Sequence, residues 1–598
     1  MCGFTGSISY HNIDNSKISE GNNFIECRGP DSKLTLNRKV NDLNVSLIFN
    51  RLSILDLSEK ANQPMYSKKF NTTLMFNGEI FNHNELREEL IRKGLEFTTS
   101  HSDSETVLLG LSYFGMSFIG KMKGQFSIFF YDENKNTAYL IRDRLGQKPL
   151  YYSLDESTLT FGSSLLSLLK IKKTHSLSST QVYNYLNYGI VSSPNTLFKD
   201  FYKVCPAEII QISFKGGKSH STKSIYWKPE EYLGDKSFDK DQFFDILTES
   251  IDIRASADVK VANFLSGGID STAITKNLYD KGTGVNSFSV YFDNAKYDES
   301  KYINEVTNKY NLNHKSILIS ADIKESDIFQ ALESLDEPYS DPSVVPSFVL
   351  SREISKHYKV AISGDGGDEL LGGYVRTADS LKYKSSFVNN ISKLYSLYPP
   401  FLGTGNRFLS KSSDLEQRYR SYLEDHKFMN LLKIDSERNS YAQHLNSSNY
   451  EPYKRLLVAD YKFYLPEMMM FKVDRTSMKN SLEVRSPFVD HKLIEFILSS
   501  STDYVDIHNP KKILKEYLNE DFGVNFTKRK KQGFVFDVES WVYKNINLVN
   551  EIINNGEIAK GLNENIVSQL SIYKSRINGQ RIWKIFVLEE YLSRVRSL

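Results

Sequence analysis

Residues 259–280 read VKVANFLSGGIDSTAITKNLYD, and this stretch decides the fold of the larger part of the chain. An apolar run at 259–265 is followed by the turn Ser266-Gly267-Gly268, a helical pattern at 271–280 and a second apolar run at 285–292. A strand, a helix and a second strand in this order form the repeating unit of open α/β sheets. We therefore predict a doubly wound α/β domain around this stretch.

The loop Ser266-Gly267-Gly268-Ile269-Asp270-Ser271 is a candidate phosphate site. Glycines permit close approach of a phosphate, and backbone N–H groups at a helix N-terminus bind negative charge. The loop lacks the lysine of P-loop kinases, whereas its spacing resembles the PP-loop of ATP pyrophosphatases, which implies AMP and pyrophosphate as products. In isolation, an ordinary structural turn is the alternative for such a hexapeptide.

The first third of the chain has a different pattern. Short β-branched and aromatic runs at 45–48, 73–76 and 125–131 alternate with Gly, Asn and Asp turns, and 84–93 is the clearest helix. This pattern predicts an α+β domain with antiparallel sheets.

The composition of the chain changes at two points. A polar stretch with little periodicity separates the two patterns, and a helical pattern resumes at Asp239. We predict a first domain at 2–210, a linker at 211–238 and a second domain at 239–598. Helical periodicity dominates after about Thr377, which predicts a helical C-terminal extension of the second domain.

Cys2 is a candidate nucleophile because of its position. Removal of Met1, favoured before a small residue, would leave Cys2 with both a thiol and a free α-amino group. The amine titrates near pH ~8 and the thiol near ~8.5, so the amine can accept the thiol proton without a separate histidine. N-terminal nucleophile enzymes use this arrangement. A small buried apolar residue is the alternative interpretation.

Five short motifs accompany Cys2 in sequence order: Cys2-Gly3-Phe4, Arg28-Gly29-Pro30-Asp31, Arg51-Leu52-Ser53-Ile54, Asn77-Gly78-Glu79-Ile80 and Ser102-Asp103-Ser104-Glu105. They resemble the class II glutamine amidotransferase domain, an N-terminal nucleophile glutaminase with an αββα sandwich. The resemblance implies that Arg51 binds the glutamine carboxylate and Asp103 its ammonium group. It implies an oxyanion hole from the Asn77 amide and the Gly78 N–H. It assigns further glutamine contacts to Leu52, Ile54 and Glu79.

Another stretch that matches this family is residues 143–152, DRLGQKPLYY, for which the resemblance implies a buried turn without a chemical role. Two positions depart from the family pattern: Cys27 stands where histidine is frequent, and Ser164 where glutamate is usual. For Cys27 we favour a buried inert cysteine over a second thiol near the site.

A second loop follows the apolar run 360–362 and reads SGDGGDELLGGY at 363–374, which resembles the asparagine synthetase signature. The resemblance implies that Asp270 and Asp368 hold Mg²⁺ on the pyrophosphate. It gives Asp365 a catalytic role at the acceptor, at a position where some family members have glutamate. It implies ATP contacts, chiefly backbone and apolar, from Phe264, Leu265, Ser266, Gly267, Gly268, Asp270, Ser271, Val290, Ser363 and Gly364.

Residues 464–490 also match the synthetase domain in order, and they imply a helix that carries Lys472, Asp474 and Arg475. For Lys472 a solvated helix face is an equal alternative. Further on, Lys531 begins a Lys-Gln-Gly-Phe segment that aligns with a family segment whose lysine contacts phosphate. The resemblance therefore assigns Lys531 to charge stabilisation in the transition state.

Charge and cysteine content exclude several classes of protein. The chain of 598 residues has a net charge of +2, which gives no electrostatic case for nucleic acid and disfavours a PP-loop enzyme acting on transfer RNA. Three cysteines without a CxxC pair predict neither a disulfide framework nor a zinc site. We find no signal peptide and no membrane-spanning apolar run, so we expect a cytoplasmic protein without a membrane partner.

Together these resemblances imply a glutamine-dependent asparagine synthetase with glutamine, ATP, aspartate and Mg²⁺ as its small-molecule partners. Ammonia released at Cys2 would attack an acyl-adenylate. The open alternative is another carboxylate, such as a sugar uronic acid in surface-polysaccharide synthesis, because the Asp365 variant of the loop is common in that branch. A β-lactam-forming relative is disfavoured because Cys2 is present, and a degenerate binding protein because every expected polar group is present. The oligomeric state stays open, with a homodimer among the options.

Overall fold

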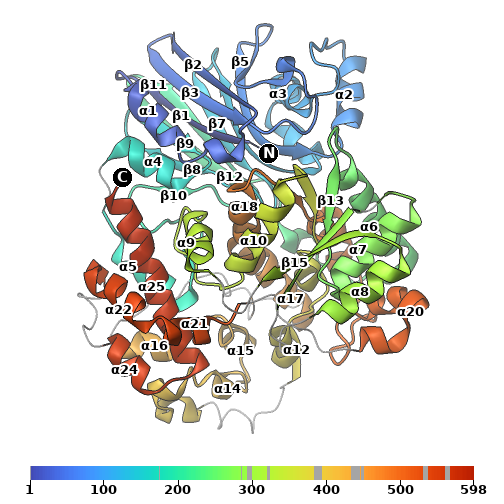
Figure 1. The fold of residues 1–598 in the computed structure, drawn as a ribbon. Helices are drawn as coiled ribbons and strands as arrows, with labels where there is room; N and C mark the ends of the chain where they lie inside the picture. The colour runs from blue at the N-terminus through green and yellow to red at the C-terminus, as the bar shows by residue number, and fades with distance from the viewer. Residues whose placement is uncertain are drawn as a thin grey trace.

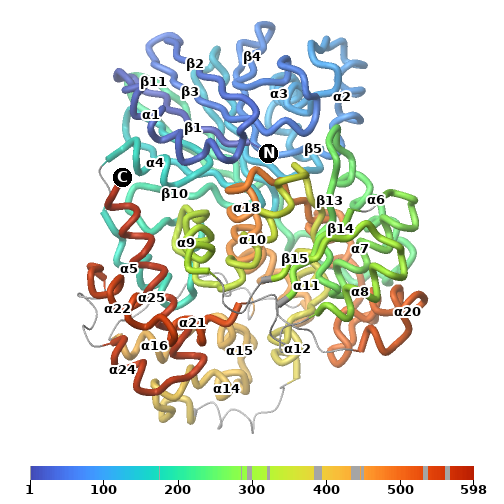
Figure 2. The backbone as a smooth tube through the Cα atoms, viewed as in Figure 1, coloured from blue at the N-terminus to red at the C-terminus, as the bar shows by residue number. Residues whose placement is uncertain are grey.

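The computed structural model of the protein describes residues 2–173, 176–284, 286–292, 299–319, 324–382, 393–432, 445, 450–528, 536–558 and 566–598. The N-terminal domain forms the upper part of the molecule in Figure 1, and the C-terminal helices form much of its lower part. The backbone trace shows the parallel sheet and its helices between these two ends (Figure 2).

Two six-stranded sheets form the N-terminal domain, and all neighbouring strands in them are antiparallel. In the order of the first sheet, the strands are β10 (Tyr202–Lys203), β8 (Tyr151–Leu154), β9 (Thr158–Gly162), β1 (Gly3–Ser9), β3 (Leu43–Arg51) and β2 (Ser32–Val40). In the order of the second sheet, they are β12 (Lys218–Ile225), β11 (Glu208–Lys215), β7 (Thr137–Arg142), β6 (Gly124–Asp132), β5 (Thr72–Ile80) and β4 (Met65–Ser67).

The two sheets stack through apolar side chains, and helices cover their outer faces. Phe129 of the second sheet stacks on Phe161 of the first with ring centroids 4.2 Å apart. The covering helices are α1 (Asn15–Asn22) and α4 (Leu165–Lys172) on the first sheet, and α2 (His83–Arg92) and α3 (Asp103–Phe114) on the second. The predicted αββα sandwich is confirmed.

The segment predicted as a linker at 211–238 contains a β-hairpin. Strand β11 crosses residue 211 and pairs with β7, and β12 pairs with β11. One face of β11 is buried in the core through the side chains of Ile210, Ile212 and Phe214, and this burial holds the strand in place. The residues of β12 are almost all exposed, and their polarity gave the segment the appearance of a linker.

The second domain has a five-stranded sheet in which all strands are parallel. Its order is β15 (Asn313–Ile319), β14 (Asn286–Phe292), β13 (Val261–Phe264), β16 (Val360–Ile362) and β17 (Glu483–Arg485). On one side are α10 (Val344–Ser355) and α18 (Phe471–Met478), and on the other α6 (Lys240–Ala255), α7 (Ile269–Asp280) and α19 (His491–Ser499). Helices on both faces confirm the predicted α/β architecture.

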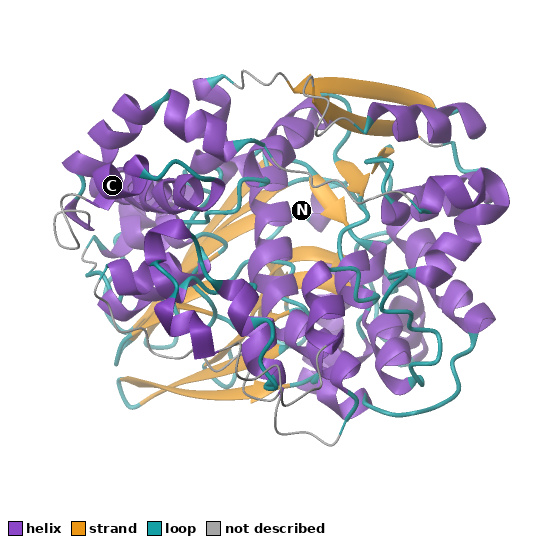
Figure 3. Ribbon diagram, turned by 90° about the horizontal axis from the view of Figure 1, so that it is seen from below, coloured by secondary structure: helices purple, strands orange, loops and turns teal. Residues whose placement is uncertain are grey.

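Helices make up most of the rest of the second domain, and Figure 3 shows helices along both sides of the strands. They are α8 (Ser300–Lys309), α9 (Glu325–Glu333), α11 (Gly367–Leu370), α12 (Val375–Lys382), α14 (Asn406–Leu409), α15 (Leu415–Arg420), α16 (His426–Leu431), α17 (Pro452–Ala459), α20 (Lys512–Thr527), α21 (Val538–Lys544), α22 (Ile546–Asn555), α24 (Ile566–Ile572) and α25 (Arg576–Arg596). A π-helical segment, Asp460–Met470, joins α17 to α18.

The C-terminal helix α25 packs against α5 (Ser179–Tyr188) of the N-terminal part of the chain. The Lys584 ammonium donates to the carbonyl of Leu186 at 2.9 Å, and the Tyr185 hydroxyl donates to the carbonyl of Lys584 at 2.9 Å. The helical extension therefore contacts both domains. Within the described ranges, no helix combines the length and the apolar character needed to cross a membrane.

Candidate active site

Cys2 lies at the start of β1, where the two sheets of the N-terminal domain face each other. Its backbone nitrogen donates to Asn77 Oδ1 on β5 at 3.1 Å, and Arg28 Nε donates to its carbonyl at 3.0 Å. The Asn77 amide nitrogen donates to Ser127 Oγ at 3.3 Å. Sheet stacking thus brings together the predicted nucleophile and the predicted oxyanion residue.

Burial raises the pKa of the Cys2 thiol, and this effect outweighs the charge of the amino terminus, a hydrogen bond at Leu52 and the Arg51 guanidinium, which lower it. Only 7% of Cys2 is exposed. A thiol in this environment stays protonated at neutral pH, so its reaction requires a base close by.

Two glycines of the N-terminal motifs allow close backbone approaches. A Cβ atom on Gly78 would lie 2.1 Å from the carbonyl oxygen of Gln125 in β6. A Cβ atom on Gly29 would lie 2.2 Å from the carbonyl oxygen of Asn50 in β3. Any other residue at these positions would force the neighbouring strand away, which explains why the motifs have glycine there.

The two residues predicted to bind the ends of glutamine are both buried. The Arg51 guanidinium donates to the carbonyl of Ser58 at 2.8 Å and to Asn62 Oδ1 at 2.9 Å, so it also holds the loop that follows β3. Asp103 Oδ2 accepts from the backbone N–H of Ile80 at 3.1 Å. Burial raises the pKa of Asp103, although His83 and the Ile80 hydrogen bond act against it.

Three other predicted glutamine contacts lie where the domains meet. Leu52 and Ile54 pack with Val360 and Met478 of the second domain. Glu79 Oε2 lies 3.3 Å from the Arg485 guanidinium of β17. Burial raises the pKa of Glu79 well above its ordinary value, and the attraction of Arg485 opposes this.

Arg485 joins the two sites through a buried ion pair. Its Nε lies 2.6 Å from Glu483 Oε1, and its guanidinium also donates to the carbonyl of Ser256 at 2.6 Å. Gln125 of the N-terminal domain donates to Glu483 at 3.5 Å. A continuous set of polar side chains therefore runs from Glu79 to the parallel sheet.

The PP-loop lies between the end of β13 and the start of α7. Ser266 and Ser271 Oγ atoms lie 3.0 Å apart, and the Gly268 N–H donates to Ser266 Oγ at 3.2 Å. A Cβ atom on Gly364 would lie 2.9 Å from the backbone nitrogen of Ser271, so the two glycine-rich loops touch. This arrangement leaves backbone N–H groups at the N-terminus of α7, as phosphate binding requires.

A cavity of about 970 Å³ opens beside these loops. Its lining includes, among the predicted nucleotide, metal and acceptor residues, Phe264, Leu265, Ser266, Gly268, Asp270, Ser271, Val290, Ser363, Gly364, Asp365 and Asp368. Gly267 is not part of the lining. Its φ is +69°, and a Cβ atom there would lie 3.1 Å from the backbone nitrogen of Ile303, so it faces α8 instead.

Asp270 and Asp368 converge on Lys511, which sequence reasoning missed. The Lys511 ammonium lies 2.5 Å from Asp270 Oδ2 and 2.5 Å from Asp368 Oδ1. Burial lowers the pKa of Lys511, but the two carboxylates outweigh burial and raise it above its ordinary value. The only signal in the sequence is a pair of lysines after Pro510, at the start of α20.

The two carboxylates fit a divalent metal, because both reach one point and carboxylate oxygens are hard ligands. Among the described residues, no group of three or more His, Cys, Asp or Glu is placed to hold a metal. Mg²⁺ is commonly bound by one or two carboxylates with phosphate oxygens and waters, so two carboxylates beside a phosphate loop suffice.

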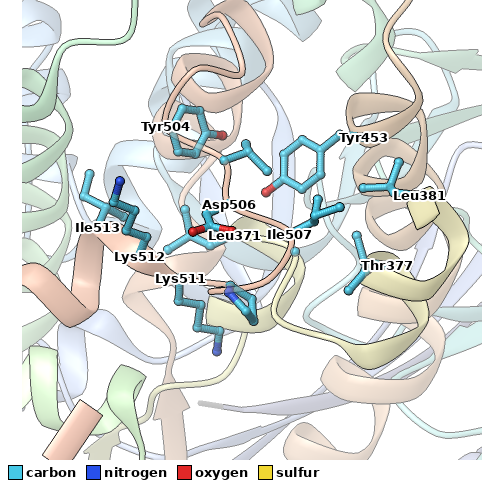
Figure 4. A pocket seen from close by; sticks show the side chains of 14 residues that line it. Leu371, Thr377, Leu381, Tyr453, Tyr504, Asp506, Ile507, Lys511, Lys512 and Ile513 are labelled. Atoms are coloured by element: carbon cyan, nitrogen blue, oxygen red, sulfur yellow. The ribbon is translucent and has the colours of Figure 1, made fainter. Parts of the chain in front are cut away.

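A second, much smaller cavity of about 20 Å³ adjoins Lys511. Tyr453, Tyr504 and Leu371 contribute to its lining, and Figure 4 shows the Lys511 side chain extending away from the two tyrosine rings. Its volume is about that of one water-sized probe, too small for a substrate. The large cavity is therefore the candidate substrate site.

The three predicted residues of helix α18 contact different neighbours. Lys472 is buried, lines the large cavity and donates to Ser343 Oγ at 3.2 Å, so the exposed-face alternative is wrong. Asp474 accepts from the two terminal nitrogens of Arg28 at 2.8 and 3.1 Å. Arg475 Nε lies 3.0 Å from Asp336. Asp474 therefore ties the helix to the N-terminal domain.

The DRLGQKPLYY segment forms the predicted buried turn and also contacts the second domain. The Asp143 carboxylate accepts from the backbone N–H groups of Leu145 and Lys148, each at 3.0 Å. Lys148 Nζ lies 3.6 Å from Asp474, and the Tyr151 hydroxyl accepts from Arg475 at 2.8 Å. The contact with the other domain was not evident in the sequence.

The sequence singled out three other positions. Lys531 lies outside the described residues. Cys27 is partly buried, and burial raises its pKa while Lys479 and Arg28 oppose this. Ser164 is buried at the N-cap of α4.

Comparison with known proteins gives matches over both domains. Residues 242–593 match the asparagine synthase family, and residues 1–227 match the glutamine amidotransferase domain family. "Asparagine synthetase [glutamine-hydrolyzing] 1" of Bacillus subtilis (strain 168) is 27% identical, over 98% of this chain and 96% of its own length. "Putative asparagine synthetase [glutamine-hydrolyzing] 2" of Methanocaldococcus jannaschii is 28% identical, over 78% of this chain and 92% of its own length. The chain therefore belongs to the asparagine synthase family and carries an N-terminal glutamine amidotransferase domain.

Proposed function

We propose that this protein is a glutamine-hydrolysing asparagine synthetase. It would convert aspartate, glutamine, ATP and water to asparagine, glutamate, AMP and pyrophosphate. The observation that carries the proposal is one continuous arrangement: Cys2 beside Asn77, the Glu79–Arg485 contact, and Asp270 with Asp368 beside the phosphate loop. The names of the two relatives support aspartate as the acceptor.

The first half-reaction takes place at Cys2. Removal of Met1 would free the α-amino group, which accepts the thiol proton. The thiolate then attacks the amide carbon of glutamine, and the Asn77 amide with the Gly78 N–H stabilises the resulting oxyanion. Collapse of this intermediate forms the thioester and releases ammonia. Water hydrolyses the thioester to glutamate and regenerates the thiol.

The second half-reaction takes place in the large cavity. A carboxylate oxygen of aspartate attacks the α-phosphorus of ATP, and pyrophosphate leaves. Asp270 and Asp368 would hold Mg²⁺, which when bound neutralises charge on the pyrophosphate oxygens. Ammonia then attacks the acyl carbon, AMP leaves with the bonding electron pair, and one proton is released. Asp365 lines the cavity and would act at the acceptor.

The contact between domains supports internal transfer of ammonia. Ammonia is mostly protonated in water at neutral pH, and only the neutral form is a nucleophile. A route closed to water preserves it. The buried residues Glu79, Arg485 and Glu483 lie where the two sites adjoin, so transfer past them would avoid solvent.

The test follows asparagine, glutamate, AMP and pyrophosphate by mass spectrometry after incubation with glutamine, ATP, Mg²⁺ and aspartate. We expect the four products to appear together. Cys2→Ala should lose glutamine-dependent synthesis and keep synthesis with added ammonium. Failure of asparagine to form with either nitrogen source would exclude aspartate as the acceptor.

A second candidate function is amidation of a sugar uronic acid by the same chemistry. The observation that favours it is an aromatic pair on the cavity wall, Tyr374 and Tyr464, with ring centroids 5.2 Å apart. Aromatic side chains provide an apolar wall for the carbon face of a sugar ring. Glutamine hydrolysis together with uronic-acid-dependent AMP release, and no asparagine, would select this function over the first.

A further inference from the structure

Lys472 is a buried cation whose hydrogen-bond partner is neutral. Only 7% of the residue is exposed, and its ammonium donates to the Ser343 hydroxyl at 3.2 Å. Within the described part of the chain, no carboxylate lies within ion-pair distance of it. By contrast, the similarly buried Lys203 lies 2.6 Å from Glu337.

The ammonium of Lys472 lies beside a second positive group. Ser343 is the N-cap residue of α10, a helix of 12 residues, and both Lys472 and Ser343 line the large cavity. The N-terminus of a helix carries partial positive charge and attracts anions. A buried ammonium without a counter-charge is costly, and a bound anion offsets that cost. Lys472, beside the N-terminus of α10, therefore forms a site for an anionic group inside the cavity.

The surroundings of this site indicate which anion it takes. Asp341 and Asp365 also line the cavity. Asp341 Oδ1 accepts from the Ser343 N–H at 2.8 Å. One cavity lining therefore includes a cation and two carboxylates, which match the carboxylate and ammonium groups of an amino acid.

The phosphate end of the cavity has cations of its own, so Lys472 is not needed there. Lys511 forms ion pairs with Asp270 and Asp368. The cavity lining also includes Lys512, Lys515 and Lys528. A uronic acid, which has one carboxylate, would use that group in the reaction and leave Lys472 without an anionic partner.

We infer that Lys472, beside the N-terminus of α10, binds the second, non-reacting carboxylate of an amino-dicarboxylic acceptor. The inference rests on the proposed function and adds the residue that selects the acceptor. Lys472 would discriminate aspartate from acceptors that have the same reacting group and ammonium but lack the second carboxylate. β-Alanine is such an acceptor.

The experiment compares aspartate and β-alanine as acceptors in the full-length protein. Pyrophosphate release is measured with ammonium as nitrogen donor, so that the Cys2 site does not contribute. We expect the wild type to prefer aspartate by about 10²-fold or more in kcat/KM, because a site built for a polar group rejects the analogue that lacks it. Lys472→Gln should lose most of this preference by lowering kcat/KM for aspartate, with β-alanine and the KM for ATP nearly unchanged.

Two variants serve as controls. Lys472→Arg keeps the positive charge and should keep most of the preference. Lys356→Gln changes an exposed lysine at the far end of α10 and should behave as wild type. Glutaminase activity of each variant reports whether the chain is folded.

Three results would overturn the inference. An equal loss with both acceptors, or a raised KM for ATP, would place Lys472 at the nucleotide. A Lys472→Gln variant that keeps the wild-type preference would show that another group reads the second carboxylate. If the wild type releases no pyrophosphate with aspartate, then the proposed acceptor and the inference fail together, whereas the first two results leave the proposed function standing.

Discussion

Lys511 stands where the two predicted metal ligands meet. Its ammonium is 2.5 Å from one carboxylate oxygen of Asp270 and 2.5 Å from one of Asp368. The lysine supplies the counter-charge that two adjacent carboxylates need. A divalent metal at the same carboxylates would have to compete with it, or displace it toward the phosphate groups.

Replacement of Lys511 with methionine should therefore make stability depend on the metal. Without the lysine, the two carboxylates repel each other, and we expect a loss of about 3–5 kcal/mol in the metal-free protein. Mg²⁺ should raise the thermal unfolding midpoint of Lys511→Met by more than that of the wild type. The measurement is thermal unfolding with and without Mg²⁺. Equal Mg²⁺ shifts in both proteins would show that the metal binds elsewhere.

Helix α18 is the element that connects the two sites. It has eight residues, and it directs Lys472 to the cavity and Asp474 to Arg28 of the N-terminal domain. It follows the π-helical segment, in which Tyr464 lines the cavity and Asp460 accepts from Arg376 at 2.9 Å. Irregular helices of this kind are frequent at functional sites.

Asp474→Asn should loosen the contact between the domains. Burial would raise the pKa of Asp474, but Arg28 and Lys148 outweigh burial and hold the pKa at about 2. Loss of the charge leaves Arg28 and Lys148 buried without their counter-charge, so we expect destabilisation of about 3–5 kcal/mol. Glutamine-dependent synthesis should fall more than ammonium-dependent synthesis, because the Cys2 carbonyl is held by the same Arg28.

Chemical denaturation and the two activity assays check this prediction. The matched control is Lys492→Gln, which removes an exposed pair with Glu495 and should cost at most about 1 kcal/mol. The pKa of Asp474 is lower in the folded protein than the value of about 3.9 in the unfolded chain. Its contribution to the free energy of unfolding is therefore present above about pH 3.9 and is lost as the pH falls toward 2. If the wild type became still more stable relative to Asp474→Asn below pH 4, this assignment would be contradicted.

At the scale of the whole molecule, a buried cluster of ionisable side chains joins the domains. Lys203 of the N-terminal part lies 2.6 Å from Glu337 and 3.7 Å from Glu467 of the second domain. Tyr151 donates to Glu337 at 3.3 Å. Burial raises the pKa of Glu337 to about 7, with Lys203 acting in the opposite direction.

Stability should therefore depend on pH near neutrality through Glu337. The folded protein keeps this proton up to about pH 7, whereas the unfolded chain loses it near pH 4.5. The stabilisation from the protonated group is present below about pH 4.5 and lost as the pH rises through 7, by up to about 3 kcal/mol. Compared with Glu337→Gln, the wild type should become relatively less stable between pH 5 and 8 in denaturant titrations. A constant difference in the free energy of unfolding between the wild type and Glu337→Gln across that range would refute a raised pKa of Glu337.

The sequence by itself determined the two kinds of domain and much of the local structure. Alternating apolar residues specify the antiparallel strands, and the β13–loop–α7 unit follows from one apolar run, two glycines and one helical pattern. These features depend on neighbours in the chain, so periodicity and turn chemistry reveal them.

Tertiary structure alone decided which of these parts meet. Arg28 binds Asp474 across 446 positions of sequence, and Lys511 reaches Asp270 across 241. Periodicity shows only that a helix has a buried face, not what that face contacts. The sequence therefore could not decide whether Lys472 is exposed to solvent or belongs to the site. The direction of α18, the pairing of the β11–β12 hairpin and the meeting of Glu79 with Arg485 follow from the packing of whole elements. That packing depends on every apolar face in the molecule at once.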